Sequence, residues 1–387
     1  MSEIKVKRKF DFSKLKELGQ MDLKDIGSLF SNKKITKILN TKIEGPKNIV
    51  SFDFGSKAIK IVTGKYSNGK LAITKCLDIP TPPDAILDGN IADKKQLSDI
   101  IQFTLKEEGI RAKDAIITIN SSSIINREIV IPKVEEDEIA TVIRYEIQQY
   151  LPINLNDYIL QYIVLDEIID DNGEKLKVNV ISVPNKIAKE YYDLIEEIGL
   201  NPYVLDVTYN SIRKINNYLI MNQEKEEKGT VAFVDMGATS INVTIFKNGK
   251  LEFTRIIKSG GDNIDYALSL ENNMSIKSTE SLKIKEADLY SDTKVNKVVK
   301  KSVDEMLDDL ERIFKFYNNK LVGNEINKIY IYGGSSNLSA IEKYMADRFN
   351  IDVEKISMLD NVEIKSKELG AETIEQYLNA IGAIIRI

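Results

Sequence analysis

The sequence predicts an α/β protein made of two related lobes that face one cleft. Three observations support this prediction. The chain has 387 residues, more than a single hydrophobic core usually holds. Short apolar strands alternate with amphipathic helices along most of it. One strand, turn, strand pattern also occurs twice, about 180 residues apart, and an internal repeat at that distance indicates two lobes of similar construction.

The repeated pattern is an apolar strand, the triplet Asp-x-Gly, a polar turn and a second strand. The first copy runs from Ile49 to Val62 and contains Asp53 and Gly55. The second copy runs from 231 to 245 and contains Asp235 and Gly237. A glycine lets the amides of a turn converge on an anion, and an aspartate at the strand end can hold Mg²⁺ through water. One such hairpin is typical of ordinary turns, but two copies favour a phosphate site between lobes.

The composition excludes several classes of chemistry. The chain has no histidine, which excludes Ser-His and Cys-His nucleophiles and His-ligated zinc. Its one cysteine, Cys76, excludes an intramolecular disulfide and is expected in the core. With 43% hydrophobic and 29% charged residues, and no window near the roughly 18 apolar residues of a membrane span, we expect a cytoplasmic protein. Carboxylates, Mg²⁺ and backbone amides remain, and they suit phosphoryl chemistry.

The charge is unevenly distributed along the chain. Residues 1–47 hold 12 Lys and Arg against 6 Asp and Glu, whereas residues 48–387 hold 42 against 53. The acidic body argues against nucleic-acid binding. The basic arm contains two helical-looking pieces, Phe12–Leu18 and Leu23–Phe30, each too short to be stable alone. The arm is either a flexible tail or a segment that docks on an acidic partner or anionic lipid.

In the first half of the body, turn residues and apolar periodicity predict strands and helices in alternation. A Pro-rich connection at Pro80–Asp84 precedes the first expected helix, and Gly109 ends that helix. After the first hairpin, the expected elements are strand Leu71–Leu77, helix Lys94–Glu108, strand Ala115–Asn120, strand Ile124–Ile131, helix Glu135–Tyr150, strands Tyr158–Ile169 and Lys175–Val183, helix Asn185–Ile198, strand Tyr203–Asp206 and helix Tyr209–Met221.

The second half begins after a charged linker at 222–229. The second hairpin is followed by a strand, a Gly260-Gly261 turn and mainly helical sequence. A third glycine turn, Gly333-Gly334-Ser335, ends a later strand, and glycine there would let the backbone lie against a flat purine. The expected elements are strand Leu251–Ile257, helical sequence from Asp262 to Lys320, strand Ile329–Tyr332, helix Leu338–Phe349 and a helix near Thr373–Ile384.

This order of two phosphate hairpins and a Gly-Gly strand end resembles the actin/Hsp70/sugar-kinase superfamily of nucleotide-binding proteins. Glu280 and Lys283 match the Glu-x-x-Lys of Hsp70-like members, in which two side chains of one helical face bind the ribose and base. Asp206 falls where the superfamily has an acidic residue that orients the attacking water. The P-loop pattern does not occur in the chain.

Within that superfamily the sequence resembles the PilM family of type IV pilus assembly proteins over about residues 48–387. The pieces that carry the resemblance fall in the family's order. They are the Asp53–Lys60 hairpin, Asp88–Ile91, Ile131–Lys133, Glu146–Pro152, Asp235–Ala238, Phe253–Ile257 with Gly260-Gly261, and the ending Ala380–Arg386. The most informative piece is Gly-Ser-x-x-x-Lys of the first hairpin, whose Lys60 would reach the phosphates.

The resemblance implies an actin-like two-lobe ATPase fold of duplicated RNase H-like domains, with an inserted subdomain 1C and no actin-type 1B. The basic N-terminal arm departs from the family pattern. The implied division is arm 1–47, subdomain 1A at 48–115 and 201–227, 1C at 116–200, 2A at 228–261 and 328–387, and 2B at 262–327.

The resemblance also implies ATP and Mg²⁺ as cofactors. Asp53 and Asp235 would hold the metal through water, and Asp206 would be the catalytic residue of at most slow ATP hydrolysis. The implied cofactor-binding residues are Asp53, Gly55, Ser56, Lys57, Lys60, Asp235, Gly237, Ala238, Thr239, Ser240, Gly261, Glu280, Lys283, Gly333, Gly334 and Ser335.

The function implied by the resemblance is that of an ATP-binding scaffold. It would bind the cytoplasmic N-terminal peptide of a PilN-like inner-membrane protein and so lie at the inner face of the membrane, with the assembly ATPase, other platform proteins or further copies as additional partners. Two alternatives remain open. FtsA-like division proteins share the fold but continue into a membrane-targeting helix, whereas this sequence ends at Ile387. A superfamily small-molecule kinase would need a substrate aspartate, for which we find no motif.

Overall fold

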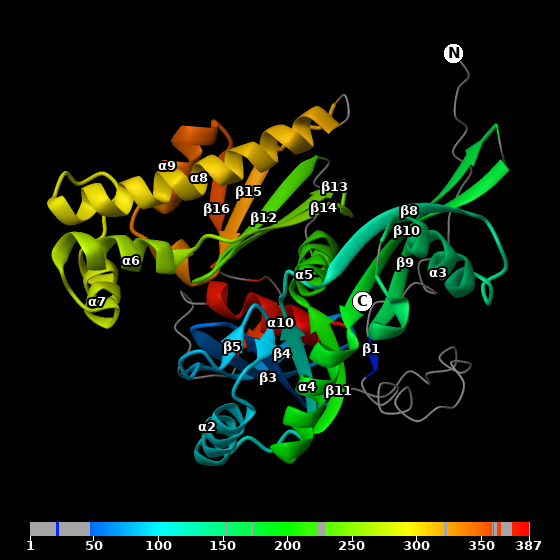
Figure 1. Cartoon of the computed structure of the whole chain (residues 1–387), viewed down its shortest axis with the longest axis horizontal. Helices are drawn as coiled ribbons and strands as arrows, with labels where there is room; N and C mark the ends of the chain where they lie inside the picture. Colours follow the sequence, from blue (N-terminus) through cyan, green and yellow to red (C-terminus); the bar gives the residue numbers. More distant parts are fainter. Residues whose placement is uncertain are drawn as a thin grey trace.

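The structure, a computed structural model, describes residues 21–22, 47–151, 153–171, 173–222, 229–320, 323–357, 359, 362–364 and 374–386. The described strands form two large sheets, one small sheet and a short two-stranded ribbon. Figure 1 shows the two large sheets in separate lobes, with helix α10 between them and the small sheet standing out to one side. None of the helices in these ranges is long and apolar enough to cross a membrane.

The first lobe is built on a sheet of seven described strands. Its central strands β11, β7 and β2 run parallel, whereas β2, β3 and β4 form an antiparallel meander. The parallel core strands are almost continuously buried because helices cover both of their faces. In spatial order the strands are β1 (Met21–Asp22), β11 (Asn201–Val207), β7 (Asp114–Ile119), β2 (Ile49–Phe54), β3 (Ala58–Ser67), β4 (Lys70–Pro80) and β17 (Val362–Ile364).

Alternation along β2 directs its side chains to two different cores. Phe52 and Phe54 point to the face covered by α2 (Lys94–Glu107) and α4 (Asn185–Glu197). Ile49 points to the opposite face, where α5 (Thr208–Asn222) and α10 (Leu378–Ile384) pack. A strand places successive side chains on opposite faces, so six residues of β2 serve both layers. The ribbon of β5 (Ile86–Leu87) and β6 (Asn90–Ile91) leads into α2, whose first turn is capped by Asp93.

The second lobe repeats this plan with five described strands. β12, β13 and β14 form the antiparallel meander, and β15 and β16 continue the sheet in parallel. The strands are β14 (Lys250–Ile257), β13 (Ile241–Lys247), β12 (Thr230–Met236), β15 (Lys328–Tyr332) and β16 (Asp352–Lys355), and the helices are α6 (Gly261–Asn272), α7 (Ile276–Glu286), α8 (Lys294–Lys320) and α9 (Ile341–Phe349). The apolar faces of α6, α8 and α9 pack on this sheet in one core.

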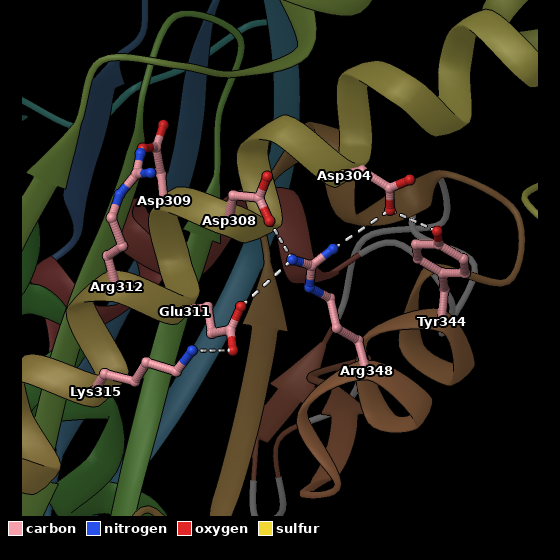
Figure 2. Close-up of polar contacts among 8 residues, drawn as sticks. All are labelled: Asp304, Asp308, Asp309, Glu311, Arg312, Lys315, Tyr344 and Arg348. Atoms are coloured by element: carbon pink, nitrogen blue, oxygen red, sulfur yellow. Dashed lines mark hydrogen bonds and ion pairs between the residues drawn. The ribbon is translucent and has the colours of Figure 1, made fainter.

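A polar cluster joins α9 to α8 on the outside of the second lobe. Figure 2 shows Arg348 of α9 reaching three carboxylates of α8. Its guanidinium lies 3.5 Å from Asp304 and from Glu311, and it also contacts Asp308, while the Tyr344 hydroxyl donates to Asp304 at 2.5 Å. An isolated surface ion pair contributes little, but one arginine shared by three carboxylates holds the two helices in register.

The small sheet lies between β7 and α4 in the chain. It comprises β8 (Ile125–Pro132), β10 (Gly173–Pro184) and β9 (Tyr158–Asp170), covered by α3 (Ile139–Tyr150) and joined by the short η2 turn (Leu155–Asp157). Ile139, Ile143 and Ile147 form the apolar stripe of α3, and they pack on this sheet in a core of its own. Isoleucines spaced four residues apart lie on one face of a helix, which is why these three share one core.

The inserted sheet also contacts the second lobe. The Asn126 amide donates to the Thr254 hydroxyl at 3.0 Å, and Lys250 lies 2.9 Å from Asp166. Both partners in the second lobe belong to β14, the edge strand of that sheet. The inserted unit is therefore held against the second lobe by polar contacts with β14.

The structure divides the chain somewhat differently from the predicted subdomain boundaries. The unit with its own core extends from β8 to β10, since β7 and α4 within 116–200 belong to the first lobe's sheet and core. Within 328–387, β17 pairs with β4 and α10 packs on the first lobe. β1 lies in the predicted arm and pairs with β11. The two expected short helices of the arm fall outside the described residues, and Met21–Asp22 lies between them in the chain.

Two helix starts also differ from the sequence prediction. The helix predicted at Glu135 begins at Ile139, because the preceding acidic residues form a turn. The helix predicted at Leu338 begins at Ile341 after a 3₁₀ turn, η3 (Gly334–Asn337). The closing helix likewise follows a 3₁₀ turn, η4 (Ile374–Tyr377).

Candidate functional site

A cleft of about 640 Å³ lies between the two lobes. All sixteen residues that the sequence predicted to bind the cofactor line it, although they come from segments spread between positions 53 and 335. The two Asp-x-Gly hairpins face each other across the cleft, and the Gly333-Gly334-Ser335 turn, which lies against Asp235, and helix α7 also line it. The tertiary structure therefore brings the predicted residues into one place; their role in binding stays a prediction.

The two hairpins have the same geometry. The Gly55 amide donates to the Ala58 carbonyl at 3.2 Å, and the Gly237 amide donates to the Ser240 carbonyl at 3.0 Å. A Cβ at either glycine would lie 2.7 or 2.8 Å from that carbonyl oxygen, closer than side chains approach backbone. Glycine is therefore required for both turns to close, and each closed turn presents its polar residues to the cleft.

The hairpins touch each other across the cleft. The hydroxyls of Ser56 and Thr239 lie 3.1 Å apart, and Lys57 lies 3.2 Å from the carboxylate of Asp262 at the start of α6. Burial opposes the charged form of Lys57, but the nearby carboxylates, Asp262 first, outweigh it and raise its pKa. A lysine and two hydroxyls thus meet where the two turns converge.

The two hairpin aspartates occupy the buried floor of the cleft. Burial raises the pKa of Asp53, while the charge of Lys60 and a hydrogen bond from Asn379 oppose that rise. Burial also raises the pKa of Asp235, to about 6, with the negative charge of Asp53 as the second cause. Two carboxylates held in a poorly solvated place repel each other, and a cation between them would relieve both effects.

Three asparagines connect these aspartates. The Asn379 amide donates to Asp53 at 3.4 Å and to Asp235 at 3.1 Å. Asn242 donates to Asp235 at 3.4 Å and accepts from Asn120 at 2.7 Å. The network crosses between lobes twice, because Asn120 and Asp53 belong to the first and Asn242 and Asp235 to the second.

Further along the cleft, the predicted Glu280 and Lys283 lie on α7. Lys283 is already held by a carboxylate that the prediction missed, since its ammonium lies 2.8 Å from Asp265 of α6 and 3.3 Å from the Gly261 carbonyl. Burial raises the pKa of Asp265, and Lys283 opposes that rise. Near Lys283, on the other side of Gly261, the Ser335 hydroxyl donates to the Gly237 carbonyl at 3.1 Å, which fixes the third turn against the second hairpin.

Sequence reasoning missed Asn120, Asn242, Asn379, Asp262 and Asp265, all of which line the cleft. Asp262 and Asp265 had a usable signal, because they follow the Gly260-Gly261 turn near the start of α6. Asn242 stands next to the second hairpin. No sequence signal pointed to Asn379, because it lies in a run of apolar residues near the C-terminus and its contacts depend on where α10 packs.

The structure does not bring Asp206 to the cleft. It is buried, it is absent from the residues that line the cavity, and its carboxylate lies 2.5 Å from the ammonium of Lys214. Asn210 and the Val207 amide also donate to it, at 2.7 and 2.9 Å. Its oxygens thus accept from Lys214 and Asn210 of α5 and from the Val207 amide of β11. The predicted catalytic role stays a prediction, and the structure places Asp206 outside the residues that line the cavity.

The residues present fit a hydrated Mg²⁺. Asp53 and Asp235 supply hard carboxylate oxygens at the floor of the cleft, with amide groups around them, which is the donor type that Mg²⁺ prefers. No group of three or more Asp, Glu, His or Cys side chains suited to direct chelation occurs in the described part of the chain. Water and phosphate oxygens would complete the coordination in such a site.

Comparisons with known proteins agree with this architecture. The family model of the type IV pilus assembly protein PilM matches residues 51–387. The cell division protein FtsA of Bacillus subtilis (strain 168) is 25% identical over 269 residues, which is 63% of this chain. The chain matches 59% of the length of that relative.

Two solved structures share the fold. The PilM-PilN type IV pilus biogenesis complex superposes with a TM-score of 0.76 at 20% identity, over 89% of this chain and 98% of the other. The ethanolamine utilization protein EutJ from Carboxydothermus hydrogenoformans gives 0.52 at 15% identity, over 94% and 97%. The predicted two-lobe fold class is confirmed, whereas the subdomain boundaries stay predictions. By its family match and its architecture, the chain belongs to the PilM family of type IV pilus assembly proteins and has the actin-like ATPase fold.

Proposed function

We propose that the chain binds ATP with Mg²⁺ in the cleft between its lobes and acts as a scaffold of the type IV pilus assembly platform. The observation that carries the nucleotide proposal is the pair of hairpins, which place Asp53 and Asp235 on the floor of one cleft with Lys60 beside them. Backbone amides of the turns and the lysine suit the phosphates, and the two aspartates suit the hydrated metal.

The roles of the other lining residues follow from their positions. Ser56, Thr239 and Ser240 offer hydroxyls, and Lys57 a charge, to the phosphates. Glu280, Lys283 and the Gly333-Gly334-Ser335 turn also line the cleft, and we propose that the two side chains contact the ribose and that the turn lies against the base. Mg²⁺ would neutralise phosphate charge when bound. We propose slow hydrolysis at most, because Asp206, the residue predicted to orient the attacking water, is not among the residues that line the cleft.

Calorimetry with ATP in the presence of Mg²⁺ tests this proposal. Asp235→Ala removes a carboxylate that faces the metal, and Lys60→Ala removes a phosphate contact, so both should weaken binding at least tenfold, or about 1.4 kcal/mol. Lys65→Ala is the matched control, because Lys65 is an exposed residue of the same strand outside the cleft. Equal affinity in all four proteins would refute the site.

We further propose that the inserted subdomain, the β8–β10 unit, binds the cytoplasmic N-terminal peptide of a PilN-like inner-membrane protein. The similar solved structure is a PilM-PilN complex. At the base of this subdomain, a second and more open cavity of about 430 Å³ lies where β9 begins and β10 ends, lined by Asn154, Asp157, Tyr158, Asn185 and Lys186 among others. Such an association would hold the chain at the inner face of the membrane. The assembly ATPase, other platform proteins and further copies remain candidate partners.

A peptide with the N-terminal sequence of the PilN-like protein of the same genome tests this second step. Lys186→Glu reverses a charge in the cavity, and Lys189→Glu reverses one on the same helix outside it. The first change should weaken peptide binding about tenfold, or 1.4 kcal/mol, and the second should not. Equal effects of both variants on peptide affinity would indicate that the peptide binds outside this cavity.

The FtsA similarity favours one alternative, an FtsA-like tether in cell division. The pilus scaffold and the division tether would bind different partner proteins. Co-purification from cells that express the tagged chain at natural levels should recover pilus platform proteins under our proposal. Recovery of division proteins and a septal position in the cell would favour the alternative.

A further inference from the structure

Asn379 occupies a special position in the fold. It belongs to α10, whose residues are all buried, and its own side chain is 6% exposed. α10 packs on α5 and on strands β2, β3 and β7 of the first lobe. From there the side chain faces the floor of the cleft, where it lies between an aspartate of each lobe.

The hydrogen bonds of Asn379 fix the orientation of its amide. Its Nδ2 donates to Asp53 Oδ2 at 3.4 Å and to Asp235 Oδ2 at 3.1 Å, and its Oδ1 accepts from the Tyr332 hydroxyl at 3.5 Å. An ionised carboxylate can only accept, so the NH₂ end must face the two aspartates. Each hydrogen of that group thus serves one carboxylate, and the amide bridges the pair.

The bridge matters because the two carboxylates have the same charge and lie in a poorly solvated place. The charge of Asp53 adds to the burial that raises the pKa of Asp235, and the hydrogen bond from Asn379 acts in the opposite sense. Without a donor between them, the side chains would turn apart. A second amide, Asn242, holds Asp235 from within its own lobe at 3.4 Å, but only Asn379 contacts both aspartates among the described hydrogen bonds.

We propose that Asn379 is a positioning residue for Mg²⁺: its amide sets the separation and the orientation of Asp53 and Asp235, so that their remaining oxygens face the hydrated metal of a bound nucleotide. The inference rests on the proposed binding of ATP with Mg²⁺. Groups that orient metal-facing residues from the outer shell commonly affect metal affinity strongly although they do not touch the metal. Through Asn379, the core of the first lobe also makes a direct hydrogen bond to Asp235 of the second lobe.

The experiment compares ATP affinity with Mg²⁺ and with EDTA in the full chain. Asn379→Leu keeps the branched shape at Cγ and removes both donors. Asn379→Gln keeps the donors and moves them by one methylene. The Mg²⁺-dependent gain in affinity should fall by about 10- to 100-fold in Asn379→Leu and by less in Asn379→Gln, while affinity in EDTA stays near wild type. A general loss of folded protein would lower both affinities together.

Asn324→Leu is the control for loss of a buried amide. Asn324 is 6% exposed, donates to the Tyr317 carbonyl at 3.2 Å, accepts from Lys247 at 2.8 Å and does not line the cleft. Its variant should keep the full Mg²⁺ gain. If Asn379→Leu fails to fold, Asn379→Gln decides the question, because a wild-type Mg²⁺ gain in that variant would show that the position of the amide is unimportant.

The outcomes separate this inference from the proposed function. Wild-type protein that does not bind ATP would overturn both. Wild-type protein that binds ATP equally with Mg²⁺ and EDTA would overturn the inference and leave nucleotide binding in place. An unchanged Mg²⁺ gain in both Asn379 variants, or an equal loss with and without Mg²⁺, would show that Asn379 only supports the packing of α10.

Discussion

The ammonium of Lys57 lies 3.2 Å from the carboxylate of Asp262, so a lysine of the first lobe's hairpin is paired with the first turn of a helix in the second lobe. The Ser56 and Thr239 hydroxyls meet beside this pair at 3.1 Å. The contacts close the cleft where the two turns converge. A phosphate that enters there would compete with Asp262 for Lys57.

This competition predicts opposite effects of removing the two partners. Lys57→Met should weaken ATP binding because a positive charge next to the phosphates is lost. Asp262→Asn should strengthen it by a few fold, because Lys57 is released and a negative charge is removed. The pair is more than one third exposed, so each effect should stay within about 1 kcal/mol. Calorimetry with ATP and Mg²⁺ measures both, and weaker binding by Asp262→Asn would contradict the competition.

The ionised carboxylate of Asp235 should lower the free energy of unfolding when no metal is bound. Its pKa is raised to about 6, first by burial and then by Asp53, so the folded chain binds a proton more tightly than the unfolded chain. The stability that this proton contributes is present below the unfolded value near 4 and is lost as the pH rises through about 6. Asp235→Asn should therefore be more stable than wild type at pH 7.5 by about 2 kcal/mol, while ATP binding is lost.

Chemical denaturation without Mg²⁺ at pH 7.5 and pH 5 checks this prediction. The advantage of Asp235→Asn should shrink at pH 5, where the wild-type carboxyl is largely protonated. Asp352→Asn is a control, because Asp352 lies on the exposed edge strand β16 outside the cleft. A variant less stable than wild type at pH 7.5 would show that charge repulsion is not the dominant effect at this position.

Asp206 is predicted to support folding. Its carboxylate and the ammonium of Lys214 are both almost fully buried, and Lys214 also donates to the Ala383 carbonyl at 3.3 Å. Asp206→Asn should destabilise the chain by about 3–5 kcal/mol, because the charge of Lys214 loses its partner. Any hydrolysis rate per folded molecule should stay the same. A variant of normal stability that has lost hydrolysis would restore Asp206 as the catalytic residue.

Lys214 should also make the free energy of unfolding depend on pH in the alkaline range. Burial lowers its pKa to about 8, and the charge of Asp206 only partly opposes this effect. Between about 8 and the unfolded value near 10.5, the unfolded chain holds the proton that the folded chain has released, so this lysine makes the free energy of unfolding rise with pH. Urea denaturation of wild type and of Lys214→Met from pH 7.5 to 9.5 should show the rise only in wild type. Parallel curves would contradict the assignment.

The inserted subdomain should respond to the nucleotide through β14. The Asn126 amide donates to the Thr254 hydroxyl at 3.0 Å, so movement of the second lobe is transmitted to β8. Thr254→Val removes the hydroxyl at nearly constant volume. It should leave peptide affinity without ATP unchanged and reduce the change that ATP causes, a coupling typically worth 1–3 kcal/mol. Peptide titrations with and without ATP measure it. Lys250→Met, which breaks the exposed pair with Asp166, should have a smaller effect.

The sequence by itself determined the local elements of the site. Gly55 and Gly237 each follow an Asp-x step at the end of an apolar strand, and only glycine allows the turn amide to reach its carbonyl. Because that geometry depends on neighbours within five residues, both hairpins were predictable with their aspartates. The cores followed from periodicity in the same way, as in the isoleucine stripe of α3.

The tertiary structure alone decided which distant residues meet. Asn379 contacts Asp53 and Asp235 because α10 packs under the first lobe's sheet, and nothing within α10 distinguishes that face from another buried one. Asp206 stands at the predicted place in the chain, but α5 brings Lys214 to its carboxylate and closes it off. Hydrogen bonds and charge pairs between elements depend on packing angles that involve the whole core, and local sequence patterns do not contain them.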